Sequence, residues 1–202
     1  MIAVVDYDAG NMMSVCKALD FLGAEYYVTR DITELRNADK IILPGVGAFG
    51  DAMEKLKNYG LIDEIRNLVK GGKPFLGICL GMQIMFEQSD EAPGVEGLKL
   101  LGGKIKRIPT GEYTKIPHMG WNSLHLCKDT KLFADVREGA YVYFVHSYYL
   151  DADDKNIVAA QTEYNVTIDA AVECGNIYGC QFHPEKSSDV GLGILNNFVS
   201  LA

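Results

Sequence analysis

Short apolar runs alternate with amphipathic segments along the first half of the chain. Continuous apolar runs predict buried strands, whereas apolar residues spaced three and four apart predict helices. The segments that predict strands are Ile2–Tyr7, Tyr26–Thr29, Lys40–Leu43 and Pro74–Ile78. Helical spacing is present in Met12–Leu22, Ala48–Lys57, Leu61–Val69 and Leu80–Glu87. Strands that alternate with helices imply a parallel sheet covered by helices on both faces.

The second half of the chain is richer in strand-forming segments. They are Gly103–Ile108, Asn122–Leu126, Tyr141–Ser147, Ile157–Thr162, Ala170–Cys174 and Ile177–Cys180, and a closing helix is expected at Val190–Leu201. No linker, low-complexity segment or repeat separates the two halves. We therefore predict a single domain over residues 1–202. Its fold class is α/β, with a mostly parallel central sheet flanked by helices and with added antiparallel strands.

Composition and charge narrow the class of protein. The 202 residues are 48% hydrophobic and 23% charged, with a net charge of -8 and no basic stripe, which argues against nucleic acid as a partner. The apolar start Ile2–Val5 meets Asp6 at once, unlike a signal peptide, and no apolar run approaches the ~20 residues that span a bilayer. We expect a cytoplasmic protein with no membrane partner.

The cysteines argue against a disulfide framework or a metal site. The chain has 5 cysteines in irregular spacing. There is no CxxC pair, and the histidines have no ligand-like spacing such as HxxxH. We expect no bound metal, and most cysteines are expected to be small buried side chains.

One cysteine joins a predicted strand to a predicted helix. Gly77-Ile78-Cys79-Leu80-Gly81 has the form G-x-C-x-G, the cysteine version of the nucleophile elbow. Such a turn needs glycines because the chain crowds itself there, and it presents its central side chain at the carboxyl end of a strand. A helix N-terminus also favours the thiolate, the form that attacks a carbonyl. The alternative is a buried cysteine at a tight turn.

A candidate base for Cys79 lies in Gln181-Phe182-His183-Pro184-Glu185. Residues two apart in an extended segment point to the same side, so His183 and Glu185 are expected to lie together. A carboxylate beside an imidazole fixes its tautomer and stabilises its protonated form. We therefore expect a triad of Cys79, His183 and Glu185, against the alternative of an incidental histidine in a surface turn. His146, at the end of another predicted strand, is expected to line the site.

A glycine-rich loop, Gly45-Val46-Gly47, follows the predicted strand Lys40–Leu43. Its glycines let the backbone bend and approach a ligand. A tetrahedral intermediate needs donors aimed at its oxygen. The N–H of Leu80 is one candidate, and an N–H from Val46 or Gly47 is the other. The loop lacks the GxxxxGK[ST] and GxGxxG patterns of phosphate loops, and a plain glycine-rich turn is the remaining alternative.

These three segments, in this order, resemble the class I, triad-type glutamine amidotransferases, over essentially the whole chain. In that family PGVG, GICLGMQ and FHPE form the glutaminase site, and all three stand unbroken here. The resemblance implies that Cys79 attacks the amide carbon of glutamine, giving a γ-glutamyl thioester and ammonia. Water then releases glutamate, with His183 as proton shuttle. No metal or organic cofactor is implied.

Two further segments narrow the resemblance within the family. Asp6–Asn11 with Ser14-Val15, and Pro117–Asn122, resemble the glutaminase subunits of imidazole glycerol phosphate synthases. This implies a heterodimer with a (βα)₈-barrel cyclase subunit. That subunit would use the ammonia to make imidazole glycerol phosphate and aminoimidazole carboxamide ribotide in histidine biosynthesis. Asp8 is a departure, because the family more often has glycine there, and it leaves the backbone after the first strand open.

The resemblance also implies which residues hold glutamine. Gly45, Gly47, Gln83, Glu91, Ser147 and Tyr148 match such positions. A carboxylate such as Glu91 suits the α-ammonium group, and backbone N–H groups suit the α-carboxylate. Gln83 and Glu91 as solvated residues, and Tyr148 as a strand aromatic, are the alternatives.

The lone tryptophan, Trp121, fits an exposed interface anchor better than a core position. The cyclase-facing patch that we expect consists of Asn11, Met119, Trp121, Asn122 and Lys186. We also hypothesise that the Gly45–Val46 peptide must turn to aim its N–H at the oxyanion, and that partner binding drives this turn.

Other functions compete with this interpretation. The chain can be a glutaminase that serves another ammonia acceptor, such as pyridoxal phosphate or guanylate synthesis, against which Pro117–Asn122 argues. It can be a stand-alone thiol hydrolase or redox sensor of similar fold, against which the segment Phe182–Glu185 argues. A non-catalytic scaffold would not require Cys79, His183 and Glu185 together.

Overall fold

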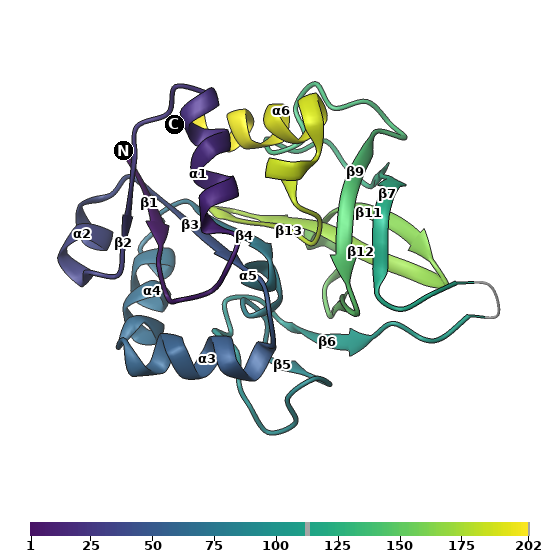
Figure 1. The fold of residues 1–202 in the computed structure, drawn as a ribbon, viewed down its shortest axis with the longest axis horizontal. Helices are drawn as coiled ribbons and strands as arrows, with labels where there is room; N and C mark the ends of the chain where they lie inside the picture. The colour runs from purple at the N-terminus through teal and green to yellow at the C-terminus, as the bar shows by residue number, and fades with distance from the viewer. Residues whose placement is uncertain (112–113, 202) are drawn as a thin grey trace.

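The structure is a computed structural model that describes residues 1–111 and 114–201 (Figure 1). Its first half alternates strands and helices, as the hydrophobic pattern predicts. In chain order the elements are β1 (Ile2–Val5), α1 (Met12–Phe21), β2 (Tyr26–Thr29), α2 (Ile32–Asn37), β3 (Lys40–Gly45), α3 (Phe49–Asn58), α4 (Leu61–Lys70), β4 (Phe75–Cys79) and α5 (Leu80–Gln83).

The second half consists mainly of strands and closes with a helix. Its elements are β5 (Gln88–Ser89), β6 (Gly103–Arg107), β7 (His118–Ser123), β8 (His125–Leu126), β9 (Tyr141–His146), β10 (Tyr148–Ala152), η1 (Lys155–Ile157), β11 (Val158–Tyr164), β12 (Val166–Cys174), β13 (Ile177–Cys180), η2 (Pro184–Lys186) and α6 (Ser188–Val199).

A central sheet combines strands from both halves in the order β2-β1-β3-β4-β13-β12-β11-β8. The strands from β2 to β13 pair in parallel, and the pairs from β13 to β8 are antiparallel. The expected α/β fold with a mostly parallel sheet and added antiparallel strands is confirmed. Because β13 lies beside β4, residues about 100 positions apart in the sequence leave the sheet at the same edge.

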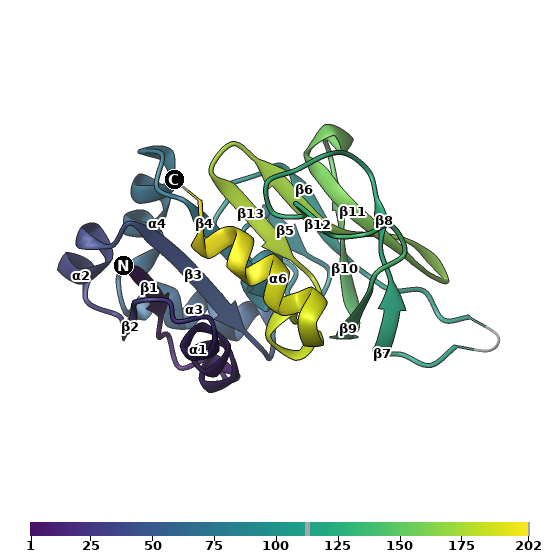
Figure 2. The same ribbon diagram turned by 90° about the horizontal axis from the view of Figure 1, so that it is seen from above.

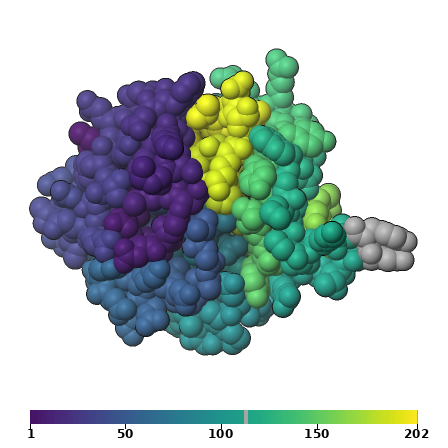
Figure 3. Space-filling view, in the orientation of Figure 1, coloured from purple at the N-terminus to yellow at the C-terminus, as the bar shows by residue number. Residues whose placement is uncertain are grey.

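Helices cover both faces of this sheet (Figure 1). Helices α3 and α4 bury side chains such as Phe49 and Ile65 against one face, whereas α1 and α6 bury Leu19 and Phe198 against the other. In the space-filling view the N-terminal part of the chain lies directly beside α6 (Figure 3). Every helix in the described ranges is too short or too polar to traverse a bilayer.

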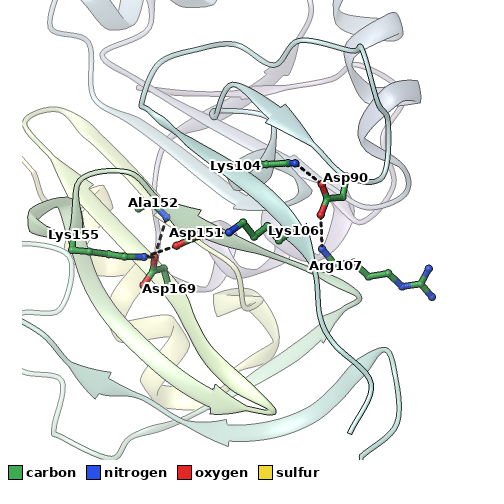
Figure 4. Close-up of polar contacts among 8 residues, drawn as sticks. All are labelled: Asp90, Lys104, Lys106, Arg107, Asp151, Ala152, Lys155 and Asp169. Atoms are coloured by element: carbon green, nitrogen blue, oxygen red, sulfur yellow. Dashed lines mark hydrogen bonds and ion pairs between the residues drawn. The ribbon is translucent and has the colours of Figure 1, made fainter.

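Two smaller sheets lie beside the antiparallel part of the central sheet (Figure 2). One has the order β10-β6-β5 and the other pairs β7 with β9. Ion pairs tie the first of them together: Lys104 contacts Asp90 at 2.7 Å and Lys106 contacts Asp151 at 2.6 Å (Figure 4). Asp90 is thereby held to β6, which fixes the loop that continues into Glu91.

Two of the predicted elements are wrong, and one helix was not predicted. Helix α2 was not expected, and it forms because Asp31 caps it, accepting from the N–H groups of Thr33 at 2.7 Å and Glu34 at 3.1 Å. The expected strand Asn122–Leu126 is divided between β7 and β8, which pair in different sheets. The expected helix Leu80–Glu87 ends at Gln83, because a fully buried apolar run has the same pattern in a helix and in a buried turn.

Strand β10 was also not expected, and β12 begins at Val166 rather than at Ala170. Both differences result from pairing with strands that the local sequence pattern does not specify. β10 pairs with β6, and the first residues of β12 pair with the end of β11.

Candidate active site

Cys79 occupies a sharp turn between β4 and α5, with φ 54° and ψ −110°. Non-glycine residues rarely adopt such a backbone, and it persists where the surrounding structure enforces it, often at functional sites. A Cβ on Gly77 would lie 2.7 Å from the carbonyl oxygen of Gly81, and a Cβ on Gly81 would lie 1.8 Å from that of Leu43. The expected elbow is present, and close backbone contacts require both of its glycines.

His183 and Glu185 follow β13, the parallel neighbour of β4. The His183 N–H donates to the Tyr143 carbonyl at 3.0 Å, and the Ser187 hydroxyl donates to the His183 carbonyl at 2.6 Å. The contact between His183 and Glu185 was expected from an extended segment. That expectation is wrong, because Glu185 lies in the 3₁₀ turn η2. The turn still brings Glu185 Oε1 to 2.8 Å from His183 Nδ1, and both side chains are fully buried.

The second ring nitrogen of His183, Nε2, is buried and makes no hydrogen bond within the described part of the chain. Burial disfavours charge on the ring, but the adjacent Cys79 sulfur and Glu185 carboxylate outweigh burial and raise the pKa of His183 from 6.5 to about 9. At neutral pH the imidazole is therefore protonated. Since Nδ1 faces Glu185, Nε2 is the nitrogen that can exchange a proton with the sulfur.

Asn11 reaches this pair from the start of α1. Its Nδ2 donates to Glu185 Oε1 and lies 3.3 Å from His183 Nδ1. Asn11 has φ 73°, a left-handed conformation that asparagine tolerates better than most residues. The sequence predicted Asn11 only for the cyclase-facing patch, and the structure places it against the buried carboxylate as well.

A cavity of about 340 Å³ opens beside Cys79, a size that suits a small ligand. Gly45 does not line it, but lies in β3 directly opposite Cys79. His146 lines it, as expected from the sequence. The other lining residues include most of those that the sequence assigned to the oxyanion and to glutamine: Val46, Gly47, Leu80, Gln83, Glu91, Ser147 and Tyr148.

Two of the polar side chains in this cavity are held by the protein. Glu91 Oε2 accepts from the Phe49 N–H at 2.7 Å, at the start of α3, where a helix favours a carboxylate. Gln83 Nε2 donates to the Tyr148 carbonyl at 3.0 Å and to Gln181 Oε1 at 3.0 Å. Their orientation is therefore set before any ligand enters.

Gln181 continues this hydrogen-bond chain to the nucleophile. Its Nε2 lies 3.8 Å from the sulfur of Cys79, and its side chain is fully buried. Gln181 was not among the residues expected at the site. Its position two residues before His183, after a predicted strand, was the available signal.

The loop Gly45–Gly47 leaves β3 next to the elbow. Gly47 has φ 112°, which favours glycine, and a Cβ on Gly45 would lie 2.2 Å from the hydroxyl oxygen of Tyr7. Both glycines are thus required for separate reasons. Tyr7 was not expected near the site, because an aromatic residue at the end of an apolar run has the pattern of a core residue.

His146, which lines the cavity, contacts a second buried histidine, His118. His118 Nδ1 is 3.0 Å from His146 Nε2, and His146 Nδ1 is 2.8 Å from the Tyr148 carbonyl. Burial lowers the pKa of His118 to about 4 and that of His146 to about 3, so both rings are uncharged at neutral pH. Asn122 Nδ2 lies 3.3 Å from His118 Nε2, which extends this chain of polar groups along β7.

The expected cyclase-facing patch differs in exposure from residue to residue. Met119 is 63% exposed and Trp121 is 52% exposed, on one face of β7. Lys186 is exposed, whereas Asn11 and Asn122 are half-buried. Trp121 therefore lies at the surface rather than in the core, as its sequence context indicates.

Asp8, the departure from the family pattern, has φ 61°. This is the conformation that glycine adopts readily. The Asp8 carboxylate accepts from Arg30 at 2.8 Å and from the Tyr59 hydroxyl. The Lys55 ammonium donates to the backbone carbonyl of Asp8. These contacts hold an aspartate in a backbone that usually requires glycine.

Comparison with known proteins agrees with this geometry. Residues 3–201 match the family described as glutamine amidotransferase class-I. A protein from Caldanaerobacter subterraneus named imidazole glycerol phosphate synthase subunit HisH is 49% identical over 198 residues, covering 98% of this chain and 97% of that protein. A Geobacillus kaustophilus protein of the same name is 50% identical, covering 100% of this chain and 97% of its own length.

Solved structures share the fold at lower identity. A structure titled glutamine amidotransferase has a TM-score of 0.77 and 19% identity, covering 100% of both chains. The structure of PurLQS from Thermotoga maritima has a TM-score of 0.72 and 23% identity, covering 98% of this chain and 96% of the other. Because the family match spans nearly the whole sequence and relatives share about half of it, this chain belongs to the class-I glutamine amidotransferases.

Proposed function

We propose that this chain is the glutaminase subunit of an imidazole glycerol phosphate synthase, acting as one domain in the cytoplasm. It hydrolyses glutamine and passes the ammonia to a (βα)₈-barrel cyclase subunit. The observation that carries the proposal is the meeting of Cys79 with the buried His183–Glu185 pair beside a cavity of about 340 Å³. The names of the relatives from Caldanaerobacter and Geobacillus support the choice of ammonia acceptor.

The first half of the reaction forms a thioester. The Cys79 thiolate attacks the amide carbon of glutamine, and the carbonyl oxygen becomes an oxyanion. The protonated His183 then donates its Nε2 proton to the amide nitrogen, the C–N bond breaks and ammonia leaves. Glu185 keeps its negative charge throughout and stabilises the imidazolium through Nδ1.

The second half returns the enzyme to its starting state. The neutral His183 takes a proton from water as the water oxygen attacks the thioester carbon. The C–S bond then breaks, glutamic acid leaves and loses its proton to solvent, and the thiolate and imidazolium are restored. Cys79 and His183 thus serve both halves, and no further proton carrier is needed.

Backbone donors stabilise the oxyanion in both halves. The Leu80 N–H, at the start of α5, is one, and an N–H of Val46 or Gly47 is the other. We propose that the Gly45–Val46 peptide turns its N–H toward the oxyanion when the partner binds. Glu91 would hold the α-ammonium group of glutamine, with Gly47, Gln83, Ser147 and Tyr148, which line the cavity, completing its binding site.

The partner surface is the cyclase-facing patch, in which Trp121 and Met119 provide exposed apolar area. Lys186 is the last residue of η2, and Asn11 donates to the Glu185 carboxylate of the triad. This arrangement supports communication between the partner and the triad because Asn11 belongs to both.

The test is glutamate formation by the purified chain with and without an imidazole glycerol phosphate synthase cyclase subunit. We expect the complex to hydrolyse glutamine and the Cys79→Ala variant to be inactive. Cys127→Ala is the matched control, because Cys127 is an exposed free cysteine, and it should keep full activity. A chain that hydrolyses glutamine but neither binds nor is stimulated by the cyclase would serve another acceptor. No hydrolysis in the complex would refute the glutaminase assignment.

A further inference from the structure

Only three buried side-chain nitrogen or oxygen atoms lack a hydrogen-bond partner within residues 1–111 and 114–201. Two of them, His183 Nε2 and Glu185 Oε2, belong to the proposed triad. The third is the hydroxyl of Tyr7, which is 1% exposed. Native proteins rarely retain an unpaired buried polar atom, and those that remain often have a functional role.

Tyr7 lies next to the loop Gly45–Gly47, the proposed oxyanion loop. Its hydroxyl oxygen is 2.2 Å from the position that a Cβ on Gly45 would occupy, so it rests against the Gly45 backbone. Gly45 is the residue of β3 that pairs with Cys79. Tyr7 packs in the core with Leu43, Phe49 and Leu80, and it does not line the cavity. The hydroxyl therefore reaches the loop from the core and not from the cavity.

Burial raises the pKa of Tyr7, and the nearby Cys79 raises it further. The phenol is thus neutral at all relevant pH values and remains a hydrogen-bond donor. The core around it offers no acceptor in the described structure. A phenylalanine would fill the same space without leaving an unpaired hydroxyl.

We propose that Tyr7 is a positioning residue for the oxyanion hole, whose hydroxyl donates to the Gly45 carbonyl when the Gly45–Val46 peptide turns its N–H toward the cavity. The C=O and N–H of a trans peptide point in opposite directions, so an N–H that enters the cavity sends the carbonyl to the far side. On that side the carbonyl is buried and needs a donor. The Tyr7 hydroxyl is the donor in place, and it selectively stabilises the turned state. The proposal rests on the proposed glutaminase function.

The test is Tyr7→Phe in the complex with the cyclase subunit. We expect kcat for glutamine hydrolysis to fall roughly tenfold, the effect of about one hydrogen bond, with KM within about twofold of the native value. The stimulation by the cyclase should fall by the same factor, because the isolated chain does not depend on the turned state. The melting temperature of the isolated variant should stay equal or rise, because an unpaired buried hydroxyl is removed.

Tyr27→Phe is the matched control. The Tyr27 hydroxyl donates to the Glu34 carbonyl at 2.6 Å, away from Cys79, so its removal should lower the melting temperature and leave kcat unchanged. The proposal is wrong if Tyr7→Phe keeps its kcat and stimulation within twofold, or if its loss of activity comes with a lower melting temperature. Failure of the native complex to hydrolyse glutamine would instead refute the proposed function, whatever Tyr7 does.

Discussion

Replacing a glycine by alanine should have opposite effects at two positions of this chain. Gly81, in the elbow, has an ordinary backbone conformation, but a Cβ there would lie 1.8 Å from the carbonyl oxygen of Leu43 in β3. Non-bonded carbon and oxygen atoms stay about 3 Å apart or more, so the elbow and β3 would have to separate by more than about 1 Å. At Gly193, in the middle of α6, a Cβ would meet nothing within 4 Å.

We expect Gly81→Ala to cost about 1–3 kcal/mol of unfolding free energy through overpacking. Gly193→Ala should add about 0.5–1 kcal/mol, because alanine is the better helix former. For a chain of this size 1 kcal/mol corresponds to about 2–4 °C. The melting temperature should therefore fall by about 2–12 °C for Gly81→Ala and rise by about 1–4 °C for Gly193→Ala.

The same displacement should affect catalysis. A shift of about 1 Å in the Leu80 N–H or the Cys79 sulfur lowers the rate by roughly 10²-fold, whereas Gly193→Ala should leave it unchanged. Thermal unfolding and glutamate release in the cyclase complex measure both effects. The reasoning would be refuted if Gly81→Ala melted within 1 °C of the native chain, or if it retained more than about one third of the activity.

Three other predictions follow from the contacts of single side chains. Glu185→Gln removes the charge that stabilises the imidazolium, so the pKa of His183 should fall from about 9 toward its ordinary value. The kcat/KM for glutamine should fall roughly 10²–10⁴-fold. A loss of kcat/KM below threefold would contradict this role of Glu185. Because the folded-state pKa of His183 is raised from 6.5 to about 9, its stabilising contribution is complete below about pH 6.5 and is lost as the pH rises through about 9. Urea unfolding should show this loss in the native chain and a smaller one in Cys79→Ala, and equal losses would count against it. Asp169 is buried and accepts from the Ala152 N–H at 3.1 Å and the Lys155 ammonium at 2.7 Å (Figure 4). It also accepts from the Gln161 amide at 2.8 Å. Asp169→Ala should therefore cost about 1–3 kcal/mol in chemical denaturation, while the exposed Asp153→Ala should cost almost nothing.

Local features of the sequence predicted much of this protein. The alternation of apolar runs with helical spacing predicted the parallel half of the sheet, because strand and helix periods are properties of neighbouring residues. The elbow at Cys79 was predicted for the same reason, because Gly77 and Gly81 lie within two residues of it, although the crowding at Gly81 comes from Leu43 in β3. The segment Phe182–Glu185 contains both His183 and the carboxylate that contacts it, so this pair was also predicted from neighbouring residues. The turn η2, and not an extended strand, brings the two side chains together.

What the sequence alone determined is therefore short-range: the type of most elements, the elbow, and the pairing of His183 with Glu185. The tertiary structure decided which distant segments meet. It placed β13 beside β4, so that His183 reaches Cys79, and it brought Asn11 to Glu185 and Tyr7 to Gly45. It also divided Asn122–Leu126 between two sheets. These contacts depend on strand order and on the burial of both sheet faces, and the spacing of residues along one segment carries no information about its partner in another.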